Sequence, residues 1–161
     1  MVDSRNHRQL KLPTAYIYNN IGAVYSETDH PEKAIPEHER ALRIYESAYP
    51  DHLNLDLALT HADLADAFLR EGDGDKVIEH LNEAFSIYDQ MLPDNAKQLI
   101  YPYSTLANLL VALGDYETAI TNYSHVIWLM LENEYSEESE TVQEFAARVA
   151  EVRQMQDSDD K

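Results

Sequence analysis

The 161-residue sequence contains no cysteine, which excludes disulfide bonds, thiolate zinc sites and a thiol nucleophile. Glycine is scarce, with four residues, and neither a glycine-rich phosphate loop nor a G-x-S-x-G nucleophile motif occurs. No apolar run approaches the roughly 20 residues that span a bilayer, and the N-terminal residues lack the apolar core of a secretory signal. We therefore expect a cytoplasmic protein that neither crosses nor enters a membrane.

Positive charge is also scarce, because 12 lysines and arginines oppose 30 acidic residues and leave a formal charge of −18. Such a chain repels phosphates, which argues against nucleic acid and anionic lipid as partners. Between Glu71 and Ala147 only two lysines face fifteen acids. Two interpretations remain open: a solvated, solubilising surface, or a surface that attracts a basic partner.

An internal repeat organises the remaining residues. Three segments align without gaps, beginning at Tyr18, His61 and Tyr103, and the small residues within them mark the register: Gly22, Ala65 and Ala107. The two spacings between these small residues are 43 and 42. A repeat of this length is typical of a protein built from stacked supersecondary units.

Each repeat has the apolar period of two α-helices. In the first, Tyr18, Ile21, Gly22 and Tyr25 lie on one helical stripe, and a second stripe follows a polar break. We predict an all-α, right-handed solenoid of three helix–turn–helix hairpins, over residues 15–50, 53–92 and 97–133, closed by a capping helix over 138–156. The sequence leaves open whether residues 1–14 are ordered, and residues 157–161 form an acidic tail.

Three local features refine this prediction. Glycine in the middle of a helix costs about 1 kcal/mol against alanine, so Gly22 indicates close helix packing. Pro102 predicts either a kink or a helix that starts near Tyr101. Trp128 corresponds to Arg43 and Ser86 in the other repeats, which are surface residue types. We expect the capping helix to cover it; the alternative is an exposed ring that contacts a second copy or a partner.

The pattern resembles the tetratricopeptide repeat. Residues Tyr18, Ile21-Gly22, Tyr25, Ala34 and Ala41 match its signature in the first repeat. The longer period, together with Asn19-Asn20, Pro36 and Pro50-Asp51-His52, is similar to the kinesin-light-chain-like subclass. The resemblance implies a concave groove that binds a protein or peptide segment.

Carried over position by position, the resemblance places the first helix of each hairpin along this groove. Asparagine amides suit the backbone of an extended peptide, and tyrosines suit contact anchors. The candidate binding residues are Tyr16, Asn19, Asn20, Asp63, Asp66, Arg70, Tyr101, Thr105 and Asn108. Some relatives bind a terminal carboxylate with cations at positions of this groove. The corresponding positions of this sequence hold no cation, and Asp63 would repel a carboxylate, so we expect a neutral or basic partner.

No catalytic or metal site is predicted. The seven histidines show no HxxxH or HExxH spacing, and we assign no catalytic residue and no cofactor. The sequence instead indicates a non-enzymatic scaffold or adaptor. A small acidic chaperone or immunity-type inhibitor that masks a basic partner, and a peptide-sensing regulator, are the alternatives; a homo-oligomer is left open.

Overall fold

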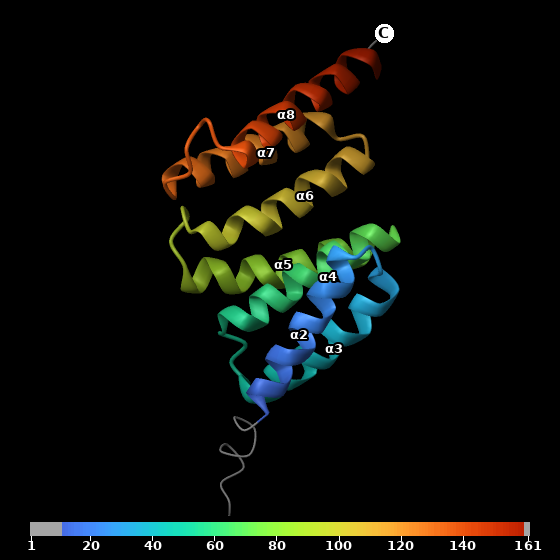
Figure 1. The fold of residues 1–161 in the computed structure, drawn as a ribbon, viewed down its shortest axis with the longest axis vertical. Coiled ribbons are helices and arrows are strands. Elements are labelled where there is room, and N and C mark those ends of the chain that lie inside the picture. Colours follow the sequence, from blue (N-terminus) through green and yellow to red (C-terminus); the bar gives the residue numbers. More distant parts are fainter. Residues whose placement is uncertain (1–10, 160–161) are drawn as a thin grey trace, which may run out of the picture. The chain divides into compact units, whose positions relative to one another are not determined.

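A computed structural model describes residues 11–159, and this part of the chain contains seven α-helices, one short 3-10 helix and no strand. The helices follow one another as antiparallel hairpins (Figure 1). This confirms the predicted all-α class. The chain divides into two compact units, residues 1–91 and 92–161, which we describe separately.

The first unit holds two hairpins. Helix α2 (Leu12–Glu27) packs against α3 (Pro31–Ala48), and α4 (Leu55–Glu71) packs against both α3 and α5 (Gly74–Met91). Small side chains at the helix contacts are fully buried, among them Ala34, Ala41, Ala65 and Ala84. Because these residues lack bulk, the helix axes approach closely and larger side chains fill the space beside them. Helix α2 begins at Leu12, before the predicted start, because Pro13 lies in its first turn, where a missing N–H group costs nothing.

Gly22 confirms the predicted close packing. A Cβ atom built on this residue would lie 2.6 Å from the ring of His38 on α3, and His38 is fully buried. No residue larger than glycine fits between α2 and this imidazole without displacing it. The local helix penalty of glycine is therefore offset by the histidine that it admits.

Capping residues stabilise several helix ends. Asn54 accepts a hydrogen bond from the backbone N–H of Leu57 (3.0 Å) at the start of α4. Gly72 ends α4 in the left-handed conformation, with φ of 82°. Asp115 caps the start of the helix Tyr116–Glu132, where its side chain accepts a hydrogen bond from Thr118 N at 3.2 Å.

The second unit consists of a short 3-10 helix, η1 (Lys97–Leu99), and three α-helices: α6 (Ile100–Ala112), α7 (Tyr116–Glu132) and α8 (Glu140–Asp159). Helix α7 packs against both α6 and α8. Pro102 lies in the first turn of α6, which starts at Ile100, so the proline is near the helix start as one of the two predictions had it. Helix α8 buries Val142, Val149 and Val152 and continues three residues beyond its predicted end.

Residues 1–10 and 160–161 lie outside the described part of the chain, whereas residues 12–14, whose order the sequence left open, belong to the first turn of α2. Residues 157–159, expected to belong to the acidic tail, form the last turn of α8. None of the helices between residues 11 and 159 is both long and apolar enough to cross a bilayer.

Candidate partner-binding site

A buried polar network joins the first two hairpins. His38 Nδ1 donates to Asn19 Oδ1 (2.7 Å), and Asn19 Nδ2 donates to Asp63 Oδ2 (2.8 Å). The donor and acceptor assignments follow because a carboxylate and a carbonyl oxygen can only accept. The network therefore ties α3 to α2 and α2 to α4 through three side chains.

Asn19 is consequently less available to a ligand than the sequence predicted. Its side chain is 8% exposed, its oxygen is occupied by His38, and one of its two N–H groups is occupied by Asp63. The main role of Asn19 in the described structure is to position Asp63. Asn20, its neighbour, is exposed on the same helix.

Asp63 is the most unusual charge on this surface. Burial raises the pKa of its carboxyl group from 3.8 to about 6, the hydrogen bond from Asn19 lowers it, and the nearby charge of Asp66 raises it further. No lysine or arginine pairs with Asp63 among residues 11–159. The Asp63 side chain is partly exposed, so a ligand that brings a further donor or a cation can reach its carboxylate and would be favoured there.

The neighbouring charges on α4 are already paired. Arg70 Nε donates to Asp66 Oδ2 at 2.9 Å, one helical turn away, and Arg70 Nη1 lies 3.8 Å from Asp29. Tyr16, at 61% exposure, presents an aromatic ring on α2. The first unit thus carries an acidic pair on α4, and an exposed asparagine and an exposed tyrosine on α2.

The candidates on α6 behave differently from one another. Thr105 is buried at 1% exposure, and its hydroxyl donates to the carbonyl oxygen of Tyr101 at 3.2 Å, so it does not reach the surface. Tyr101 is 37% exposed. Asn108 is exposed and accepts a 2.5 Å hydrogen bond from the hydroxyl of Tyr123. Of the three, Asn108 is the residue that borders a cavity.

That cavity is a cleft of about 690 Å³ on the second unit, and its volume falls in the range of ligand sites. Helices α6, α7 and α8 supply its walls: Ser104, Asn108, Tyr123, Glu144, Phe145, Ala147, Arg148 and Glu151. At its floor Arg148 Nε donates to the Tyr123 hydroxyl (3.3 Å), and Arg148 Nη1 pairs with Glu151 at 2.7 Å. The cleft therefore contains a cation that the prediction lacked.

The sequence analysis did not predict the α8 residues that line this cleft, because it assigned α8 only the role of a capping helix. Val149 follows Ala107 by 42 positions, which continues the repeat register into α8. Reading α8 as the first helix of a further unit would have placed its side chains beside those of α6. The signal was present in the sequence.

The first unit also contains a histidine pair outside the predicted site. The Nδ1 atoms of His61 on α4 and His80 on α5 lie 3.0 Å apart, so one ring donates and the other accepts. Burial lowers both pKa values, that of His61 to about 4, and each ring is therefore neutral at pH 7. Among residues 11–159 no group of three histidine or acidic side chains is placed to hold a metal ion.

These observations define a class: a helical-repeat protein with polar and aromatic side chains on the first helices of its hairpins. Residues 13–90 match the family model of the tetratricopeptide repeat, which confirms the resemblance found in the sequence. This segment of the first unit is what the chain shares with tetratricopeptide repeat proteins. Repeats of this family generally mediate protein–protein interaction and are generally not enzymes.

Solved structures share the fold. A variant of a Podosopora anserina protein, described as a kinesin light chain with nearly identical TPR-like repeats, matches with a TM-score of 0.73 at 14% identity, over 88% of this chain and 66% of that one. A second structure of that description gives 0.73 at 15% identity, over 96% and 68%. A TPR-like protein from Chlorobium tepidum TLS gives 0.71 at 18%, over 90% and 96%. At these identities the likeness shows the fold alone, and none of the curated proteins matches the sequence.

Proposed function

We propose that this protein is a non-enzymatic scaffold or adaptor that binds a neutral or basic segment of a partner protein on the surface of helices α2 and α4. Tyr16 and Asn20 contact the segment, and Asp63 and Asp66 accept its hydrogen bonds. No cofactor takes part. The cleft of the second unit, with Asn108 at its edge, is a further contact region for a peptide backbone.

The raised pKa of the partly buried Asp63, which no cation pairs with among residues 11–159, supports this proposal. Partial desolvation makes the ionised carboxylate costly to the folded chain, since one pKa unit corresponds to about 1.4 kcal/mol. A partner lysine, arginine or backbone N–H would complete the hydrogen bonding of Asp63 and bring its pKa back toward the usual value. The binding of a donor therefore recovers free energy that the unbound protein lacks.

The experiment is capture of a partner from native lysate, followed by binding measurements with the captured protein. We expect Asp63→Lys and Asp66→Lys each to weaken binding at least tenfold, because each places a cation where the partner brings a donor. The matched control is Asp89→Lys, which makes the same charge change at an exposed position of α5. If Asp63→Lys and Asp66→Lys bind as the wild type does, the surface is wrongly assigned.

A second candidate function is favoured by the formal charge of −18. In that case the protein is a small acidic chaperone or an immunity-type inhibitor that masks a basic partner through its whole surface. Its binding would fall steeply between low and high salt, whereas capture of a short peptide by a peptide-sensing regulator or adaptor would depend little on salt.

A further inference from the structure

The single tryptophan lies exposed on helix α7. Trp128 is 42% exposed, so the expectation that the capping helix covers it is wrong. Its ring stacks on His125, with centroids 5.2 Å apart and planes at 19°. His125 in turn meets the ring of Tyr103 edge-on at 4.6 Å. The indole therefore stacks on His125, which itself contacts Tyr103, and the tryptophan remains 42% exposed.

This arrangement is unusual for the surface of a repeat hairpin. The equivalent positions hold Arg43 and Ser86, whose side chains water solvates well. An exposed indole gains nothing from water, but a ring already held by its neighbours loses little conformational freedom when a partner covers it. Preorganised tryptophans of this kind are the residues most often found at the energetic centre of protein interfaces.

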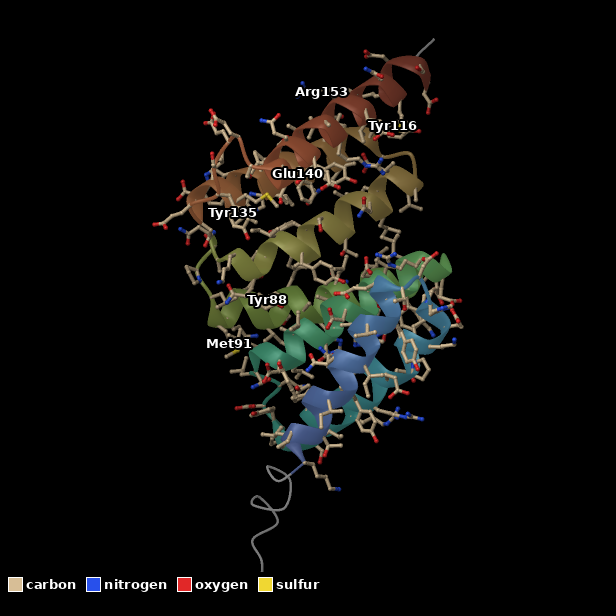
Figure 2. The ribbon with its side chains drawn as sticks, in the orientation of Figure 1. Tyr88, Met91, Tyr116, Tyr135, Glu140 and Arg153 are labelled. Atoms are coloured by element: carbon tan, nitrogen blue, oxygen red, sulfur yellow. The ribbon has the colours of Figure 1, made fainter. Side chains whose placement is uncertain are left out.

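Acidic residues dominate the charge near Trp128 in the sequence, and the flanking cations are Lys97 in η1, which packs against α7, and Arg148 on α8, which pairs with Glu151. No lysine or arginine occurs from residue 98 to residue 147, whereas this stretch contains eight acidic residues. Glu132 lies one helical turn after Trp128, on the same side of α7, and its side chain is exposed. Leu131 and Tyr135, the latter labelled in Figure 2, add exposed apolar surface close to it in the chain.

We propose that Trp128 and Glu132 form a second interaction surface, which binds an arginine side chain of a partner protein. The guanidinium group stacks on the open face of the indole and pairs with the Glu132 carboxylate. A guanidinium is planar and weakly hydrated, so it suits a flat ring better than the ammonium of lysine does. A second copy of this chain is a poor occupant, because it would bring two strongly acidic surfaces together.

The surface can be tested with defined probes, because Trp128 is the only source of tryptophan fluorescence. A peptide of alternating arginine and glycine is titrated into the protein, beside its lysine and glutamate counterparts. We expect the arginine peptide to change the tryptophan emission saturably, the lysine peptide to bind more weakly, and the glutamate peptide to have no effect.

Matched variants separate this site from general attraction to an acidic protein. Binding of a labelled arginine peptide should weaken about two- to fivefold in Trp128→Ala, and remain unchanged in Leu113→Ala, which removes another exposed apolar side chain. Glu132→Gln should weaken binding more than Glu117→Gln, the same change at the opposite end of α7. Asp63→Asn should leave the emission change intact, because this surface does not depend on the function proposed for α2 and α4.

Three results would overturn the proposal. The first is equal affinity of the wild type and Trp128→Ala, and the second is tryptophan emission that stays constant at saturating peptide. The third is a wild-type dimer that Trp128→Ala converts to a monomer, since a second copy would then occupy the surface. Far-ultraviolet circular dichroism of each variant confirms that the helices are retained.

Discussion

Replacing Asp63 by asparagine should stabilise the protein at neutral pH while it weakens partner binding. The asparagine carbonyl can still accept the hydrogen bond from Asn19 Nδ2, and the buried charge is lost. The pKa of Asp63 is raised from 3.8 to about 6, so ionisation of this group opposes folding at pH 7.

The magnitude follows from that shift. Two pKa units correspond to about 3 kcal/mol, which is an upper limit for the gain at pH 7. Because the Asp63 side chain is partly exposed, we expect a gain of about 1–2 kcal/mol. A carboxyl group with a raised pKa is protonated in the folded state first, so the destabilising contribution of Asp63 decreases as the pH falls from 6 toward 3.8. The advantage of Asp63→Asn should therefore shrink below pH 6 and vanish near pH 3.8.

The assay is urea unfolding followed by circular dichroism at pH 7, pH 5 and pH 4, with Asp89→Asn as the control for removing an exposed charge. The midpoint of Asp63→Asn should exceed that of the wild type at pH 7 and approach it at pH 4. A variant that is as stable as the wild type, or less stable, at pH 7 would refute the reasoning, because the carboxylate would then be satisfied in the folded chain.

Three further outcomes can be checked by the same unfolding measurement. Gly22→Ala should destabilise the protein by about 1–3 kcal/mol, because its Cβ would overlap the His38 ring; an unchanged midpoint would mean that the ring moves freely. Asn54→Ala should cost about 1 kcal/mol through the lost helix cap, and a loss below 0.3 kcal/mol would rule out that role. The pKa of His61 is lowered to about 4, so the unfolded chain binds protons at this group more readily below pH 6.5, and the contribution of His61 to stability should fall as the pH drops from 6.5 toward 4. His61→Tyr, which removes this group beside His80, should flatten that decline, and an unaltered pH profile would contradict the assignment.

The sequence predicted the helices well because their signals are local. The apolar stripe through Tyr18 and Tyr25 depends only on the 3.6-residue period, and Gly72 and Asp115 act within a few residues of the helix ends that they set. Pro102 illustrates the limit of such signals, since a kink and a helix start have the same local sequence. In the described structure α6 starts at Ile100, near the proline.

The candidate site was less predictable. The repeat register placed Asn20, Asp63 and Asp66 on the first helices of their hairpins, but burial decided which side chains remain accessible. Thr105 is enclosed, and Asn19 is bound to two neighbours 19 and 44 positions away in the chain. No sequence period encodes such a pairing, because it depends on the distance between helices and on side-chain direction.

The sequence alone determined that this chain forms paired helices at intervals of 42 to 43 residues and that its surface is strongly acidic. Only the tertiary structure decided that Asp63 is partly desolvated beside Asn19 and that Arg148 lines a cleft. It also decided that Trp128 stacks on His125 and remains exposed. The physical reason is that helix formation and net charge are set by neighbouring residues and by composition. Desolvation and ring stacking depend instead on how closely distant segments approach.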